Sequence, residues 1–178
     1  MGRNKMLLDV DGAPMVRRAA LMARDAGLAP LVVVVGNDEA RVREALDGVD
    51  CTFAVNPDFT GPTSGSLHAG LQALDADVDA TVILLADMIR VTTPMLSALI
   101  ASYTAGDAPL EVSRYGDVLA PPLLFRRALW PELLAWHGEG CGKAVVKEHQ
   151  HEATVHDWPQ SALRDVDTPD DYRELVPQ

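Results

Sequence analysis

The sequence has little positive charge and few cysteines. Its 178 residues include 15 lysines and arginines against 26 aspartates and glutamates, a formal net charge of −11 at pH 7. Proteins that bind the phosphate backbone of nucleic acids normally carry a basic face, so this balance argues against a nucleic-acid partner. The two cysteines, Cys51 and Cys141, are too few for a disulfide framework. They favour a reducing compartment, and we expect a cytoplasmic protein.

Long hydrophobic runs are also missing. No apolar run approaches the roughly 18 residues that a membrane span requires, and the chain start lacks the charged and apolar segments of a signal peptide. We therefore expect no membrane partner. With 48% hydrophobic residues, the chain is in the size range of one ordinary domain, and we expect a single domain over residues 1–178.

Short apolar runs alternate with helical patterns along the chain, which is typical of a sheet with crossover helices. The runs predict strands at 31–35, 52–55, 81–86, 110–115, 123–125 and 154–158. Helices are predicted at 14–26, 37–46, 93–103, 128–136, 142–149 and 169–175, with a further one beginning near Ser66. Continuous apolar runs are typical of parallel strands covered on both faces. The predicted fold is therefore α/β, with three layers and a mostly parallel sheet that has helices on both faces.

Asp87 is a candidate for metal chemistry. It directly follows the apolar run 81–86, and open parallel sheets bind their ligands outside the carboxyl ends of the strands. Mg²⁺ prefers one or two carboxylates together with substrate phosphates, which an aspartate at this position provides. An aspartate that only ends a turn or caps a helix fits the position equally well.

The opening segment of the chain is a candidate for phosphate binding. Gly2 lets a backbone approach phosphates closely, while Arg3 and Lys5 supply positive charge to them. Taken alone, basic residues at a chain start are more often only solvated.

Two later segments are candidates for the nucleoside and the metal. The loop 56–65 is rich in Pro, Gly, Thr and Ser and leads into a helix start, which offers hydroxyls and backbone N–H groups to a base, a ribose or an anion. An ordinary long loop has the same composition. Near the end of the chain, Asp167 precedes Thr168, Pro169 and two more acids, which is a signature of a helix start. A second metal ligand at Asp167 is compatible with that interpretation.

Taken together and in this order, these segments resemble the MobA-like nucleotidyltransferases, and within them the molybdenum cofactor cytidylyltransferase branch. Residues 1–8 are similar to the second half of the signature loop L-A-A-G-x-G-x-R-M-G-x-x-K-x-L-L, and residues 11–15 to the G-x-P that follows it. Asn56-Pro57 with residues 65–67 resembles the nucleoside segment. Residues 85–88 resemble G-D-M-P, and residues 165–172 resemble D-I-D-T-P-E-D.

This resemblance implies attack by an acceptor phosphate on the α-phosphorus of a triphosphate, CTP in this branch, with release of pyrophosphate. It assigns catalysis to Lys5 and Asp87, the nucleotide to Gly2, Arg3, Lys5, Asn56, Gly65 and Ser66, and Mg²⁺ to Asp87 and Asp167. The implied acceptor is the molybdopterin cofactor, and the product would serve a molybdenum enzyme.

The sequence departs from the family pattern in three places. The first strand and the glycines of the phosphate loop have no counterpart, so we expect Met1 to be the internal Met of the R-M-G motif in a chain shortened at its N-terminus. Ile89 replaces the usual Pro, and residues 119–122 stand where the family often has Gly-His-Pro, on the acceptor side. Two alternatives therefore stay open: a transferase for a sugar phosphate or another small phosphate acceptor, and a non-catalytic module for the maturation of a molybdenum enzyme.

Overall fold

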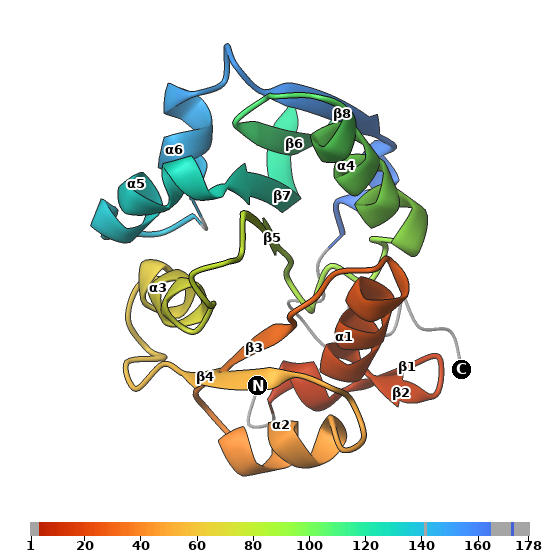
Figure 1. The fold of residues 1–178 in the computed structure, drawn as a ribbon. Coiled ribbons are helices and arrows are strands. Elements are labelled where there is room, and N and C mark those ends of the chain that lie inside the picture. The colour runs from red at the N-terminus through yellow and green to blue at the C-terminus, as the bar shows by residue number, and fades with distance from the viewer. Residues whose placement is uncertain (1–3, 141, 165–171, 173–178) are drawn as a thin grey trace.

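Strands and helices alternate along most of the chain, which confirms the predicted α/β class (Figure 1). The computed structural model describes residues 4–140, 142–164 and 172. The strands are β1 (Asp9–Val10), β2 (Ala13–Pro14), β3 (Val32–Val35), β4 (Thr52–Val55), β5 (Ala80–Ile83), β6 (Leu110–Tyr115), β7 (Val118–Arg126) and β8 (Thr154–Trp158). The α-helices are α1 (Met15–Asp25), α2 (Glu39–Ala45), α3 (Ser64–Gln72), α4 (Thr93–Ala105), α5 (Trp130–Ala135) and α6 (Lys143–Glu148). Short 3-10 helices are η1 (Lys5–Leu7), η2 (Arg127–Leu129) and η3 (Gln160–Ala162).

The described strands pair in three groups. β3 and β4 are parallel, β1 and β2 form a small antiparallel ribbon, and the other four strands follow the order β5-β7-β6-β8. In this four-stranded sheet β6 and β8 are parallel, whereas β7 is antiparallel to both β5 and β6. The sheet is thus more mixed in direction than the apolar runs predict, because β6 and β7 form a hairpin that reverses one strand.

The strand β7 is longer than its apolar run predicts because it continues through two prolines. Its pairing with β6 shifts register between Val112 and Ser113, which leaves Pro121 and Pro122 at the irregularity. Proline lacks a backbone donor and is tolerated in a sheet at such a bulge. The carbonyl of Pro122 accepts from Ser113 Oγ at 2.8 Å, and that of Pro121 accepts from Tyr115 Oη at 2.9 Å. These side chains replace ladder bonds that the bulge removes.

Other boundaries differ slightly from the predicted ones. β5 ends at Ile83 and not at residue 86, and α3 begins at Ser64, earlier than the predicted start near Ser66. The predicted helix 169–175 lies outside the described residues, apart from Tyr172.

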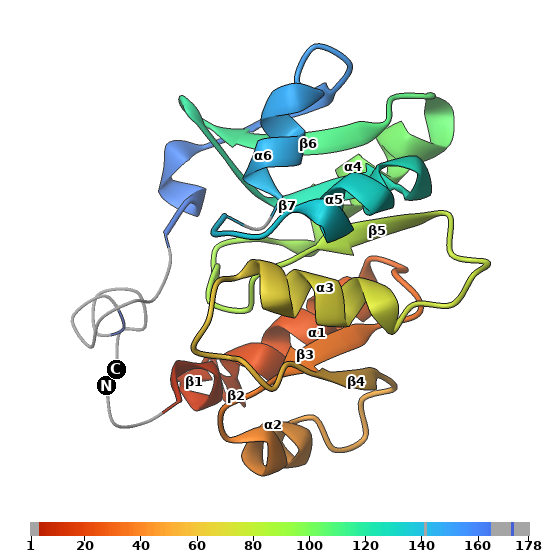
Figure 2. The same cartoon turned by 90° about the vertical axis from the view of Figure 1, so that its left-hand side faces the viewer.

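Helices cover the strands from two sides (Figure 2), which gives the three layers that the sequence predicts. On one side, α3, α5 and α6 bury Leu71, Leu133 and Val145 against β6 and β7. On the other side, α1 and α4 pack Ala23 and Leu96 in a second core. A third core joins α1 and α2 to β3. Within the described parts of the chain, no helix has the length and apolar character needed to cross a membrane.

Candidate functional site

An ion pair joins the short helix η1 to the loop that follows β5. Lys5 Nζ lies 2.7 Å from Asp87 Oδ2, and the two side chains are 31% and 17% exposed. These are the two residues to which the family resemblance assigns catalysis. A partly exposed ion pair contributes only about 0–1 kcal/mol to stability, so an incoming anion or cation can replace either partner at small cost.

Lys5 owes its position to the short helix η1. The side chain of Asn4 caps this helix by accepting from Met6 N at 3.0 Å, and its Nδ2 donates to the carbonyl of Asn37 at 3.1 Å. Asn37 follows the end of β3, and Asp87 follows β5. The segment therefore crosses the carboxyl ends of two strands, which is the edge where open α/β sheets bind ligands.

A second group of predicted residues converges where β4 leads into α3. Asn56 follows β4, is 5% exposed, and donates from Nδ2 to Ser66 Oγ at 3.0 Å. Its Oδ1 accepts from Asp58 N at 3.1 Å. A Cβ added to Gly65 would lie 3.3 Å from Asn56 Nδ2, so this glycine allows the helix start to approach the amide closely. Asn56, Gly65 and Ser66 are called the amide group below.

A cavity of about 530 Å³ opens beside the amide group, lined by residues of β4, the following loop and α3. Asn56 and Gly65 belong to its lining, together with Val55, His68 and Gln72. Its volume is within the range of about 300–1,000 Å³ that is typical of small-molecule sites. Two of the three predicted nucleoside residues, Asn56 and Gly65, therefore line a space that is large enough for a ligand, whereas Ser66 contacts Asn56 and does not line it.

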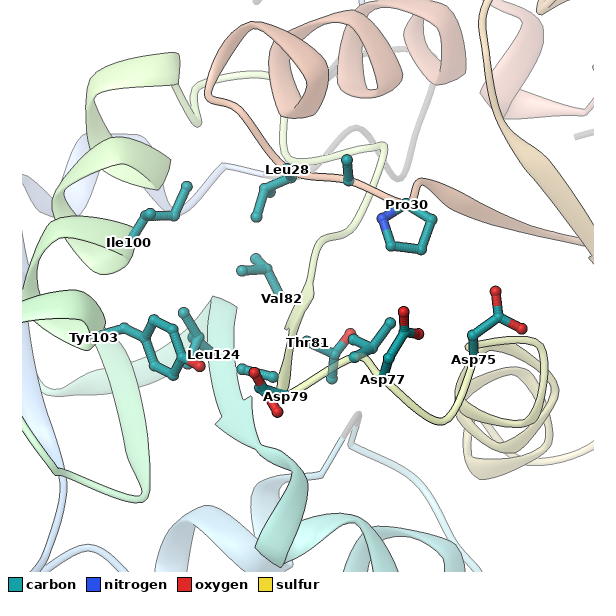
Figure 3. A pocket seen from close by; sticks show the side chains of 13 residues that line it. Leu28, Pro30, Asp75, Asp77, Asp79, Thr81, Val82, Ile100, Tyr103 and Leu124 are labelled. Carbon is teal, nitrogen blue, oxygen red and sulfur yellow. The ribbon is translucent and has the colours of Figure 1, made fainter.

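A cavity of about 450 Å³ lies at the opposite edge of the strands (Figure 3). Its lining includes residues that precede β3, such as Pro30, and three aspartates that precede β5, together with residues of β5, α4 and β7. None of the residues to which the sequence assigns a role lines it. Because parallel sheets bind ligands at their carboxyl ends, this cavity is not part of the candidate site.

Metal-ligating side chains are sparse. Over residues 4–140, 142–164 and 172, no group of three or more His, Cys, Asp or Glu side chains could hold a metal ion. Among these described residues, Asp87 provides a carboxylate at the ion pair with Lys5.

The other residues with predicted roles at the charged end of the site, Gly2, Arg3 and Asp167, lie outside the described residues. Tyr172 is described, and its hydroxyl donates to the backbone carbonyl of Asp9. It also packs against the buried pair Val10 and Met15, as do Leu8 and Ile89. Tyr172 therefore lies beside β1, close in the sequence to the segment that carries Lys5.

The sequence indicates that His149 and His151 are surface residues and not zinc ligands. In the structure, His149 Nε2 lies 2.8 Å from Glu132 Oε2 and its Nδ1 lies 3.2 Å from Glu152 Oε1. The hydrogen bond to Glu132, followed by the one to Glu152, raises the pKa of His149 above its ordinary value. These residues join the end of α6 to α5 and form no part of the candidate site.

Sequence reasoning missed a set of contacts at the start of α3. Thr63 and Ser64 form hydrogen bonds with residues 138–140, which follow α5. The sequence identifies the segment 138–143 only as a turn or a ligand loop and indicates no partner for it. The one available signal in the sequence is that no acidic residue stands in the first turn of α3.

Comparisons with known proteins identify the family to which the chain is similar. The sequence profile described as the MobA-like NTP transferase domain matches residues 1–154. A bifunctional protein GlmU from Kineococcus radiotolerans is 30% identical over 167 residues, which is 92% of this chain and 31% of that protein. The chain thus spans less than a third of that relative's length.

Solved structures give the same result. Rv0371c from Mycobacterium tuberculosis H37Rv superimposes with a TM-score of 0.87 at 26% identity, over 100% of this chain and 91% of that chain. Its complex with manganese superimposes with a TM-score of 0.79 at 28% identity, over 99% and 94% of the two chains. The resemblance inferred from the sequence segments is confirmed at the level of the family.

Proposed function

The chain belongs to the MobA-like NTP transferase family, and we propose that it transfers a nucleotidyl group from a nucleoside triphosphate to a phosphorylated acceptor, releasing pyrophosphate. The observation that carries this proposal is the contact of 2.7 Å between Lys5 and Asp87 at the carboxyl edge of the strands. A cation and a carboxylate side by side at this edge suit a reaction between two phosphates. Catalysis of such a reaction depends mainly on positioning and on stabilising negative charge.

Lys5 and Asp87 have distinct roles in this proposal. The Lys5 ammonium neutralises oxygens of the triphosphate as negative charge develops around the α-phosphorus, and the pairing with Asp87 holds it at the strand ends until substrate arrives. Asp87, with Asp167 as its proposed partner, holds Mg²⁺, which supplies positive charge to the phosphate oxygens when it is bound. The complex of Rv0371c with manganese supports a divalent cation in this family.

The amide group holds the nucleoside in this proposal. An asparagine amide offers two donor hydrogens and two acceptor lone pairs, and Ser66 and Asp58 engage one of each on Asn56. The remaining positions suit the paired donor and acceptor edge of a base. Because Asn56 is buried and held from both sides, it meets the base without reorganising.

We include CTP as the donor and molybdopterin as the acceptor, with a molybdenum enzyme as the user of the product. The support is the order of sequence segments that resemble the cytidylyltransferase branch. A sugar phosphate or another small phosphate is the second candidate acceptor. Residues 119–122 differ from the Gly-His-Pro that the family often has on the acceptor side, and the carbonyls of Pro121 and Pro122 accept hydrogen bonds from Tyr115 and Ser113 within the sheet.

The same proposal treats residues 1–178 as one working domain in the reducing cytoplasm. Burial, followed by the negative charge of Asp50, raises the pKa of the Cys51 thiol, which disfavours the reactive thiolate. Thiol titration of the folded protein checks the direction of this pKa shift.

Pyrophosphate release tests the proposed function. The protein is assayed with CTP, GTP, ATP and UTP in turn, with molybdopterin or a set of sugar phosphates, and with Mg²⁺, Mn²⁺ or a chelator. We expect release that requires a triphosphate, an acceptor and a divalent cation together. Absence of cation-dependent triphosphate binding would instead favour a non-catalytic module for molybdenum enzyme maturation.

A further inference from the structure

The start of α3 is held by a segment far away in the sequence. Residues 136–140, called the strap here, follow α5, and α5 lies beside α3 in both views (Figures 1 and 2). Gly140 N donates to Thr63 Oγ1 at 2.9 Å, and Thr63 N donates to Glu139 Oε2 at 3.3 Å. The hydroxyl and the backbone N–H of one residue thus both have partners in the strap.

Ser64 makes a second pair of contacts with the strap. Its backbone N–H donates to the carbonyl of Gly138 at 3.1 Å, and its Oγ accepts from Gly138 N at 3.1 Å. Ser64 is only 3% exposed, so these bonds satisfy groups that water reaches poorly. The ring of His137 also meets that of His68 edge to face, with centroids 5.2 Å apart.

The strap takes the place of a local helix cap. At a usual helix start, the hydroxyl of a capping Ser or Thr accepts from a backbone N–H of the first turn. Thr63 occupies the capping position of α3 but makes no such bond, and its hydroxyl accepts from Gly140 instead. The position of the first turn therefore depends on tertiary contacts.

The amide group lies immediately beyond the residues that the strap holds. Gly65 and Ser66 follow Ser64 directly, and Ser66 Oγ is the acceptor for the amide of Asn56. A Cβ added to Gly65 would lie only 3.3 Å from Nδ2 of Asn56, so the turn and the amide are closely packed. A small displacement of the first turn therefore changes the geometry between Asn56 and Ser66.

We propose that the strap positions the nucleoside-binding turn, with Thr63 and Glu139 as positioning residues that set the affinity for the nucleotide. This inference rests on the proposed function, since it concerns how that site holds its nucleotide. Neither residue touches the substrate: both act through Gly65 and Ser66. Breaking the strap weakens nucleotide binding and leaves the chemical step and the affinity for the acceptor unchanged.

Paired variants of the full chain test this inference. Thr63→Val and Glu139→Ala remove the contacts, whereas Thr63→Ser and Glu139→Gln keep a hydroxyl and a carbonyl acceptor. We expect the first two to raise the Kd for CTP, measured calorimetrically with Mg²⁺, by roughly five- to tenfold, which corresponds to the loss of about one hydrogen bond. The conservative pair stays within about twofold of the unaltered chain. Because both contacts act through one turn, the double variant is weakened less than the product of the single effects.

The controls separate positioning from general loss of structure. Glu148→Ala on α6 and Thr104→Val on α4 remove an exposed carboxylate and an exposed hydroxyl away from the strap. We expect these controls to leave the Kd for CTP unchanged. In Thr63→Val and Glu139→Ala, we expect faster hydrogen exchange at residues 65–67, whereas kcat and the KM for the acceptor stay the same.

Three results would overturn the inference. An unchanged Kd in Thr63→Val and Glu139→Ala overturns it alone, as does tighter binding in Glu139→Ala, which would mean that this carboxylate competes with the nucleotide for the Thr63 N–H. If the unaltered chain binds no triphosphate with Mg²⁺, the proposed function fails and the inference fails with it.

Discussion

The two parts of the candidate site are built in opposite ways. Lys5 and Asp87 form a partly exposed pair, joined by one ionic contact across segments that are far apart in the sequence. The amide group is buried at Asn56, and its members are joined by short-range hydrogen bonds and close packing. A weak ion pair exchanges its partners readily, whereas a buried network keeps its shape. The difference suggests that the charged pair serves the chemistry and the amide group serves affinity.

The strongest way to break this comparison is to remove the carboxylate. We expect Asp87→Ala to lower kcat by about 10²–10³-fold or more, because it removes the predicted metal ligand and the partner of Lys5. Its Tm should shift by only a few degrees, since the pair is partly exposed. Asp77→Ala, an aspartate at the cavity on the opposite edge, is the matched control. An unchanged rate in Asp87→Ala would remove Asp87 from the mechanism.

The second prediction removes the cation. Lys5→Met should reduce kcat/KM by about 10–10²-fold, because developing charge on the phosphates is no longer neutralised. Lys5→Arg keeps the positive charge but changes its geometry, so its activity should lie between that of Lys5→Met and that of the unaltered chain. Steady-state pyrophosphate release measures both, and Lys147→Met on α6 is the control. Equal activities of Lys5→Met and the control would contradict the assignment.

The third prediction concerns the amide group. Asn56→Ala should raise the KM for the nucleotide roughly tenfold and change kcat by less than about threefold, since it removes contacts made equally before and during the reaction. It should also lower the free energy of unfolding by about 1–3 kcal/mol, because the buried Asn56 side chain and its hydrogen bonds to Ser66 and Asp58 are lost. Urea denaturation and kinetics measure the two effects, with exposed Gln150→Ala as the control. A larger effect on kcat than on KM would contradict the division in which the Lys5–Asp87 pair serves the chemistry and the amide group serves affinity.

The smallest effect is expected at an ion pair outside the site, between His149 and Glu132. Since the folded pKa of His149 is raised above 6.5, its stabilising contribution is fully present below that pH and is lost as the pH rises through the folded pKa. His149→Gln should therefore lower the Tm by about 1–2 °C at pH 5.5 and by less at pH 9. Thermal unfolding across this range measures the difference, and a gap that widens with pH would contradict it.

Much of the candidate site is visible in the sequence because its residues stand at the ends of predicted elements. Asp87 follows an apolar run, and Asn56 and Ser66 bracket a loop between a strand and a helix, so their shared edge follows from the rule for parallel strands. The strap is not visible in this way. Thr63 has the residue type of a local cap, and its partner in the strap, Glu139, is 76 positions away.

The fold shows the same division. The apolar runs predict β3, β4, β6 and β8 to within a residue, because strand formation depends on local pattern. The length of β7 depends on Ser113 and Tyr115, which satisfy the proline carbonyls from the neighbouring strand. Nothing local to the two prolines predicts those partners.

The sequence alone determined which segments are strands and helices, which polar residues stand at their ends, and which family the chain resembles. Only the tertiary structure decided that Lys5 meets Asp87, that β7 lies between β5 and β6, and that residues 136–140 hold the start of α3. The physical reason is range: backbone preference and hydrophobic period act over a few residues, whereas ion pairs, strand pairing and tertiary caps depend on how distant segments pack together.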